Sequence, residues 1–409
     1  MGTVFRARDR KERREVALKV LSAAALRNVA RFEQEATLLA GLRHPHIVEY
    51  VAHGKTPDGL HYLVMEWVEG ETVAQRLERG GLDTHDSIEL ALQLTRALGA
   101  LHARAIVHRD VKPSNLMLVG GDVLRVKLVD FGVARRTTEP GRLTRTGAMV
   151  GTAGYMAPEQ VRGGKTPIDG RADLFALGCV MYECLTGQQA FTGETPLSAR
   201  AKVLVHDPPP LRVIEPSLPV ALEALVQSML SRSASHRPAD AAAVERVLVG
   251  LGSVPHGPTP SRVSVGAAET VTSPTPDAAD MCAVLVSWRT DEEADGATYQ
   301  RTISRLMGAT VESIEGGLVL LFAGDVAAAT KVALVLAEQF PRALVAVAAG
   351  DTVEQALDDS ARLVEDLEVA DTEVEAMTGV WVGRQLAPRL GKAFRVVPIG
   401  DHVRVHERG

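Results

Sequence analysis

Residues 108–132 read HRDVKPSNLMLVGGDVLRVKLVDFG, and this segment concentrates the polar residues on which the interpretation of the chain depends. Asp110, Asn115 and Asp130 stand on short polar segments that flank apolar, strand-like runs. Their hard oxygen atoms suit Mg²⁺. A carboxylate such as that of Asp110 can accept a hydrogen bond from an attacking hydroxyl, while Lys112 neutralises charge on a phosphoryl group. The segment therefore predicts chemistry on a nucleoside triphosphate.

These residues resemble the catalytic loop H-R-D-x-K-x-x-N and the D-F-G motif of bacterial, eukaryotic-like Ser/Thr protein kinases. The resemblance implies an α+β kinase fold over residues 1–250, with a small β-rich lobe and a large helical lobe. It implies transfer of a phosphoryl group from ATP, with Mg²⁺ or Mn²⁺, to a protein substrate. By the same resemblance Asp110, Lys112 and Asn115 are catalytic, and Asn115 and Asp130 bind the metal. Lysine two residues after the aspartate is typical of Ser/Thr rather than Tyr kinases.

The first 42 residues resemble part of the small lobe. Residues 4–8 and 16–21 read as strands separated by a charged turn. Lys19, in Val-Ala-Leu-Lys, matches the lysine that holds the α- and β-phosphates. Helical spacing predicts a helix over residues 28–42, and Glu35 on it matches the glutamate that pairs with this lysine, with Glu33 as the competing candidate.

The resemblance also implies where the nucleotide sits. Met65 matches the gatekeeper residue, and Glu66 begins the hinge, whose backbone groups bind adenine. Met117 would form the floor below the adenine, with Val4 and Ala17 as its roof. Simple core packing is the alternative role for Met117.

The phosphate-covering loop of the family reads G-x-G-x-x-G-x-V, of which only Gly2 and Val4 are present. We therefore expect a small lobe that lacks its first strand and some of the backbone amides that cover phosphates. Either the start codon is misplaced or the product is truncated, and the missing amides affect the expected nucleotide affinity more than the catalytic chemistry. A pseudokinase scaffold with impaired ATP binding is the alternative function that this departure favours.

A Thr- and Arg-rich segment between Asp130 and Glu159 resembles an activation loop closed by an A-P-E motif. Thr144 and Thr146 match the phosphorylated pair of related kinases. Arg109 precedes the catalytic aspartate, and a guanidinium there can pair with a phosphothreonine. We therefore expect activation by phosphorylation of this loop; a solvated Thr-rich loop is the alternative.

The overall composition excludes several classes of protein. With 409 residues the chain has room for two or three domains, and its net charge of -6 does not favour a nucleic acid partner. Three cysteines form no CxxC pair or disulfide framework, and no apolar run reaches the length of a membrane span. We therefore expect a cytoplasmic protein without a signal peptide.

Residues 251–280 are rich in Gly, Pro, Ser and Thr and predict a flexible linker. Residues 281–409 predict an α/β domain in the order strand 282–288, helix 297–307, hairpin 309–323, helix 325–340, strand 343–349 and helix 353–366. This order resembles a class III nucleotide cyclase domain of ferredoxin-like type. Ser287, Trp288 and Gly316 stand where active cyclases have metal-binding aspartates. We expect a non-catalytic domain for homodimerisation or sensing; the alternatives are an unrelated α/β domain and, least favoured, an active cyclase.

Overall fold

The computed structural model describes residues 3–21, 36, 40–57, 59–130, 153–163, 168–193, 195–252, 260, 281–288, 310–314, 317–323, 326–339, 343–350, 353–369, 379–383, 386, 390, 394–399 and 402–407. Its contacts divide the chain into two compact units. Unit 1 comprises Met1–Thr138, Pro167–Ala190 and Pro209–Ser264. Unit 2 comprises Glu139–Thr166, Phe191–Pro208 and Val265–Gly409.

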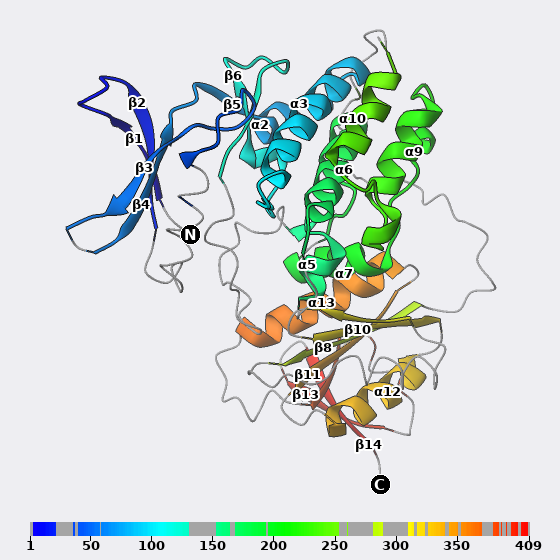
Figure 1. Cartoon of the computed structure of the whole chain (residues 1–409). Coiled ribbons are helices and arrows are strands. Elements are labelled where there is room, and N and C mark those ends of the chain that lie inside the picture. The colour runs from blue at the N-terminus through cyan, green and yellow to red at the C-terminus, as the bar shows by residue number, and fades with distance from the viewer. Residues whose placement is uncertain are drawn as a thin grey trace. The chain divides into compact units, whose positions relative to one another are not determined.

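Unit 1 begins with a four-stranded antiparallel sheet in the order β1-β2-β4-β3 (Figure 1). The strands are β1 (Thr3–Arg8), β2 (Glu15–Val20), β3 (Tyr50–Lys55) and β4 (His61–Glu66). The strands predicted over 4–8 and 16–21 are thus confirmed, each within one residue at both ends. The helix predicted over 28–42 lies almost entirely outside the described residues.

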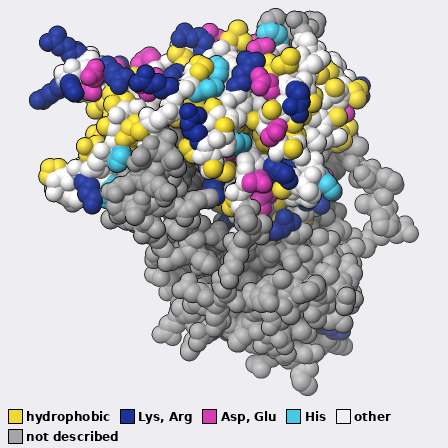
Figure 2. All heavy atoms as spheres, viewed as in Figure 1, with side chains coloured by type: hydrophobic (Ala, Val, Ile, Leu, Met, Phe, Trp, Pro, Cys, Tyr) yellow, Lys and Arg dark blue, Asp and Glu magenta, His cyan; other side chains and the backbone are white. Residues whose placement is uncertain are grey.

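The charged turn between β1 and β2 is held by Asp9, whose carboxylate accepts hydrogen bonds from the backbone of Lys11 (2.8 Å) and Glu12 (3.2 Å). Basic side chains are exposed in and beside this turn: Arg8, Arg10, Lys11, Arg13 and Arg14. Over the face of unit 1 seen in Figure 2, Lys and Arg are interspersed with Asp and Glu. This mixture of signs produces no single large basic field on that face.

The helices of unit 1 pack around α3 and α6. α3 begins after Asp83, whose carboxylate accepts a hydrogen bond from Asp86 N at 2.8 Å and so caps the helix. α10 packs on α3, and α9 packs on α6. The helices and short turns are α2 (Val73–Leu77), α3 (Thr84–His102), η2 (Pro113–Asn115), α6 (Arg171–Thr186), α8 (Leu211–Ile214), α9 (Val220–Met229), η3 (Ala234–His236) and α10 (Ala241–Gly250).

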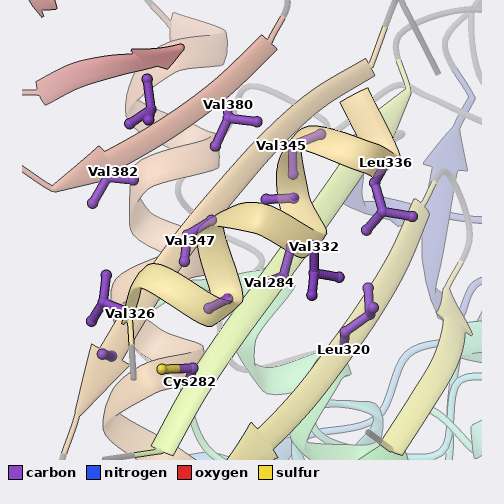
Figure 3. Packing of buried hydrophobic residues seen from close by; sticks show 14 of the residues in the cluster. Cys282, Val284, Leu320, Val326, Val332, Leu336, Val345, Val347, Val380 and Val382 are labelled. Atoms are coloured by element: carbon purple, nitrogen blue, oxygen red, sulfur yellow. The ribbon is translucent and has the colours of Figure 1, made fainter. Parts of the chain in front are cut away.

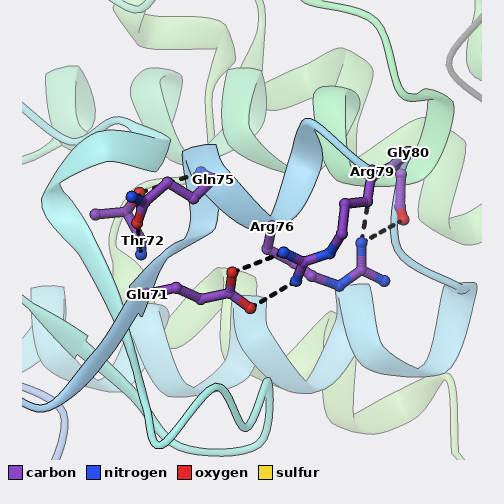
Figure 4. A network of polar contacts seen from close by, with 7 residues as sticks. Glu71, Thr72, Gln75, Arg76, Arg79 and Gly80 are labelled. Carbon is purple, nitrogen blue, oxygen red and sulfur yellow. Dashed lines mark hydrogen bonds and ion pairs between the residues drawn. The ribbon is translucent and has the colours of Figure 1, made fainter.

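A second, three-stranded sheet carries η2, the turn that ends at Asn115. β6 (Leu116–Val119) lies between β5 (Gly70–Thr72) and β7 (Val126–Leu128). β5 leads directly into α2 through a capping box, in which the Thr72 hydroxyl accepts from Gln75 N and the Gln75 side chain accepts from Thr72 N (Figure 4). Glu71 and Arg79 form a bidentate ion pair beside it, at 2.6 and 2.9 Å. This anchoring matters because α2 packs on η2.

Unit 2 is built on a seven-stranded sheet in the order β13-β14-β12-β11-β8-β10-β9. The strands are β8 (Met281–Trp288), β9 (Thr310–Ile314), β10 (Gly317–Ala323), β11 (Ala343–Gly350), β12 (Gly379–Gly383), β13 (Phe394–Ile399) and β14 (His402–Glu407). β8 runs antiparallel to both of its neighbours, β10 and β11, whereas β11 and β12 are parallel. The predicted hairpin and the strands predicted over 282–288 and 343–349 are confirmed.

One face of this sheet is covered by α12 (Val326–Gln339). Cys282, Val284 and Val286 alternate along β8 and belong to the buried cluster on this face. Figure 3 shows Val332 and Leu336 of α12 beside the sheet residues of the cluster. Burial of these apolar side chains supplies the main stabilising free energy of this part of unit 2.

The other face of the sheet is covered by α13 (Val353–Val369), which packs on β8 and β11 (Figure 1). Ala283, Ala346 and Ala348 are buried and alternate with the residues of the first face. Their small side chains allow α13 to approach the strands closely. Both helices agree with the predicted helices over 325–340 and 353–366, whereas the helix predicted over 297–307 lies outside the described residues.

Unit 2 also contains α5 (Pro158–Arg162) and α7 (Pro196–Val205), which come from the first 250 residues of the chain. Cys179, Cys184 and Cys282 are buried, and none of them forms a disulfide bond. Burial raises the pKa of the Cys179 and Cys184 thiols.

In the part of the chain that the structure describes, no helix combines the length and the apolar character needed to cross a bilayer.

Replacing Leu320 by Ala should destabilise the sheet of unit 2 by about 2–5 kcal/mol, because Leu320 is fully buried between β8 and α12 and a cavity would remain. Hydrogen exchange of the β8 and β10 amides in the full-length chain measures the effect. Lys331→Ala, at an exposed position of α12, is the control and should leave the exchange rates unchanged. Equal exchange in the two variants would contradict the assigned core.

Candidate active site

The segment that carries the predicted catalytic residues is attached to α6 by one buried carboxylate. Asp173, which has no exposed surface, accepts hydrogen bonds from the backbone N–H groups of His108 (2.9 Å) and Arg109 (2.7 Å). The ring of His102, at the end of α3, donates to it at 2.8 Å. Asp173 therefore anchors the backbone of this loop from a position more than 60 residues further along the chain.

Asp110, Lys112 and Asn115 lie together, as predicted. Lys112 Nζ lies 3.1 Å from Asp110 Oδ2. The Asn115 side-chain amide donates to the Asp110 backbone carbonyl (2.8 Å) and to its carboxylate (2.9 Å). All three residues are buried. The η2 turn brings Asn115 back toward Asp110, since Asn115 N donates to the Lys112 carbonyl at 2.9 Å. The carboxylate of Asp110 is therefore oriented from two sides.

Two backbone positions in this region have left-handed conformations that side chains rarely adopt. Arg109 has φ of 66° and Asp130 has φ of 59°. Non-glycine residues hold such conformations where the surrounding structure determines them, and these residues gather at active sites. The hydrogen bond from Arg109 N to the Asp173 carboxylate holds Arg109 in its left-handed conformation.

Lys19 on β2 forms an ion pair with Asp130, the predicted metal ligand, although 111 residues separate them. The Lys19 side chain is 14% exposed and that of Asp130 is 41% exposed. The position predicted for its family partner, Glu35, lies outside the described residues, as do Phe131 and Gly132 of the D-F-G motif. The lysine of the small sheet and the acid after β7 thus meet at one site.

The predicted roof residues share one face of the small sheet. Val4 lies opposite Lys19 across β1 and β2, and Ala17 lies opposite Met65 across β2 and β4. Because residues two apart on a strand point to the same side, Val4, Ala17, Lys19 and Met65 share the face on which Lys19 reaches Asp130. Met65 is buried, as a gatekeeper would be. Gly2, the other predicted phosphate contact, lies outside the described residues.

The residue predicted to form the floor below the adenine, Met117, lies on β6, and the predicted hinge begins at the end of β4. On β6, Leu116 and Leu118 are fully buried, whereas Met117 points to the opposite side and is half-buried. Glu66 ends β4 and its carboxylate is held by Lys127 and by Glu49 N, the latter at 2.8 Å. The side chain of Glu66 thus has a structural role, and its backbone N–H donates to the Glu49 carbonyl at 2.9 Å. The contact of this residue with adenine stays a prediction.

Several supporting residues were missed by sequence reasoning. Gln93 of α3 accepts a hydrogen bond from Val126 N at 3.0 Å, and Arg6 of β1 lies over the Trp67 ring of the hinge at 5.1 Å. His102, at the end of α3, donates a hydrogen bond to Asp173. Its position in the last turn of a helix that leads into the catalytic segment was the available signal.

His108 is buried, and its Nδ1 accepts a hydrogen bond from Asp110 N at 3.3 Å. Burial lowers its pKa, so the ring stays neutral near pH 7. A neutral, buried ring that orients the backbone has a structural role. The predicted phosphorylation sites Thr144 and Thr146 lie outside the described residues.

Comparison with known proteins agrees with this geometry. Residues 1–248 match the sequence profile of the protein kinase domain. The chain is 38% identical over 268 residues to the serine/threonine-protein kinase PknB of Mycobacterium tuberculosis H37Ra, covering 63% of this chain and 42% of the relative. It is 36% identical over 259 residues to the serine/threonine-protein kinase pkn3 of Myxococcus xanthus, covering 61% and 47%.

A crystal structure of Rad53 residues 1–466 in complex with AMP-PNP matches 60% of each chain, with a TM-score of 0.49 and 25% sequence identity. The chain spans less than half of the length of the PknB and pkn3 relatives. The match to the protein kinase domain, however, covers more than half of this chain and includes every residue of the candidate site. The chain belongs to the protein kinase family.

Proposed function

We propose that the chain is a Ser/Thr protein kinase that transfers the γ-phosphoryl group of ATP to a serine or threonine of a protein substrate. The observation that carries this proposal is the buried group of Asp110, Lys112 and Asn115. Its relatives named as serine/threonine-protein kinases support the choice of substrate class.

In this proposal Asp110 accepts the hydroxyl proton of the substrate. The hydroxyl oxygen bonds to the γ-phosphorus, the bond from that phosphorus to the β–γ bridging oxygen breaks, and ADP leaves. Lys112, 3.1 Å from the Asp110 carboxylate, offsets the negative charge that gathers on the transferred group. Asn115 keeps the carboxylate oriented through its amide.

The residues present fit a divalent metal ion such as Mg²⁺ or Mn²⁺. Asp130 supplies a carboxylate and Asn115 a side-chain carbonyl oxygen, since its amide nitrogen makes the bonds to Asp110. Both are hard oxygen donors, the type that Mg²⁺ prefers. When bound, the metal would neutralise charge on the phosphates. Lys19, which pairs with Asp130, is the cation that would contact the α- and β-phosphates.

The proposal for residues 281–409 is a non-catalytic, cyclase-type domain that mediates dimerisation or sensing. Its support is the order β11-β8-β10-β9, with antiparallel neighbours, which is the strand order of a ferredoxin-like β-α-β-β-α-β unit. Ser287 and Trp288 occupy β8 where metal-binding aspartates are expected. A cytoplasmic location belongs to the same proposal and is supported by the three cysteines, none of which forms a disulfide bond.

Asp110→Asn should lower the rate of phosphoryl transfer by about 10²- to 10⁴-fold, because the amide cannot accept the proton. Transfer of label from γ-labelled ATP to the chain and to an added protein is the measurement. Asp122→Asn, an exposed carboxylate in the β6–β7 turn, is the matched control and should remain active. If the wild-type chain binds ATP but transfers no label, it is a pseudokinase and the proposal is wrong.

Asp173→Asn should lower kcat about tenfold or more with little change in the KM for ATP, because the catalytic segment loses a charged acceptor while the small sheet is unaffected. Stability should fall by about 1–3 kcal/mol. His102→Gln removes only one of the three partners and should have a smaller effect on both quantities. A variant that changes the KM for ATP alone would contradict the positioning role.

Replacing both Thr144 and Thr146 by Ala should reduce activity toward an added substrate several-fold, since Arg109 would lose a phosphate partner. Mass spectrometry of the active wild-type chain provides the direct check. Fully active protein that carries no phosphate on either threonine would exclude this switch.

A further inference from the structure

The helix α7 is buried on nearly all sides. Seven of its ten residues are buried: Leu197, Ser198, Ala199, Ala201, Lys202, Val203 and Leu204. A helix on the surface of a domain normally buries one apolar stripe and leaves its polar side in water. Burial of a lysine together with the apolar residues shows that a second element covers the outer side of α7.

That element is α13. α13 packs on β8 and β11 with one side and on α7 with another. Several apolar residues of α13 are buried, including Leu357, Ala361 and Val364. α7 lies within residues 1–248, which match the protein kinase domain, whereas α13 lies outside them; both belong to unit 2.

An ion pair joins the two helices at their contact. Lys202 Nζ donates to Asp358 Oδ2 at 2.8 Å, across a separation of 156 residues. The two side chains are only 5% and 17% exposed. A lysine is almost never buried without a partner, and removing one member of a buried pair leaves the other charge uncompensated. The pair therefore stabilises the observed packing of α13 on α7 relative to arrangements in which one helix is shifted, because a shift would separate the two charges.

The same contact region includes the end of the predicted activation loop. β9 packs on both α5 and α7, and α5 begins at Pro158 of the A-P-E motif. The backbone just before α5 packs closely against the segment that precedes α7. A Cβ atom added at Gly154 would lie only 2.0 Å from the Phe191 carbonyl oxygen, so only glycine allows this approach. Elements of the C-terminal domain thus contact the part of the kinase domain where the activation loop ends.

We infer that α7 is the docking surface for the C-terminal domain, which binds it through α13 with Lys202 and Asp358 as the specific polar contact and so covers the end of the activation loop. The regulatory part of this inference rests on the proposed kinase function. While α13 and β9 occupy α5 and α7, another protein cannot reach those faces. Release of the C-terminal domain should then increase phosphorylation of protein substrates.

Hydrogen exchange of the full-length chain tests the interface without depending on catalysis. Lys202→Glu and Asp358→Lys should each increase amide exchange in α7 and α13 by about tenfold or more. The double variant, which exchanges the two charges, should restore protection. Asp359→Lys is the matched control, because Asp359 is the neighbouring carboxylate and faces Arg362 at 3.9 Å; it should leave α7 protected.

Two outcomes would overturn the inferred interface. Single variants with wild-type protection of both helices would show that α13 does not cover α7. Protection of α7 that disappears on dilution would show that the contact joins two copies of the chain. If Lys202→Glu fails to fold, Lys202→Met keeps the apolar stem and should still increase exchange in α13, because the ion pair between Lys202 and Asp358 is lost.

Phosphorylation of an added protein by the same variants tests the regulatory consequence. The single charge reversals should increase the rate several-fold, and the double variant should return it to the wild-type value. An unchanged rate in variants that show the increased exchange would overturn the covering role. If no variant transfers phosphate while the exchange results are as expected, the proposed kinase function is wrong and the interface stands.

Discussion

The carboxylate of Asp173 is the interaction on which the active site depends. A fully buried charge is tolerated only when hydrogen bonds replace its hydration, and Asp173 receives them from two backbone amides of the catalytic segment and from His102. Each partner is satisfied only if the segment follows one path. The requirement to satisfy one charge therefore determines the backbone of His108 and Arg109, including the left-handed conformation of Arg109.

The reactive groups reach one another through sheet register and short turns rather than through sequence proximity. Lys19 is brought to Asp130 because β2 pairs with β4 in a register that places Lys19, Ala17 and Met65 on one face. A shift of one residue would turn Lys19 to the opposite side of the sheet. The catalytic aspartate, in contrast, is oriented locally by the η2 turn, which returns Asn115 to it. The position of Lys19 in the site therefore depends on strand register, whereas the orientation of Asp110 depends on a short turn.

Motif and periodicity were sufficient to predict much of the fold and most of the described site. The strands, the helices over 326–339 and 353–369 and the grouping of Asp110, Lys112 and Asn115 follow from local chemistry, which a sequence displays directly. Gln93 and His102 were not predicted as supports, because a polar residue on a helix gives no sign of which distant backbone group it will meet. Their roles depend on tertiary packing.

Asp358 shows the same limit in the C-terminal domain. In the sequence it is one of two adjacent aspartates on an amphipathic helix, a pattern typical of a solvated face. In the structure α13 lies between a sheet and α7, so it must satisfy two surfaces at once. Small and apolar residues meet the sheet, while the carboxylate meets Lys202. A helix under both constraints cannot move on one side without changing its contacts on the other, and this is the property that a connection between two domains requires.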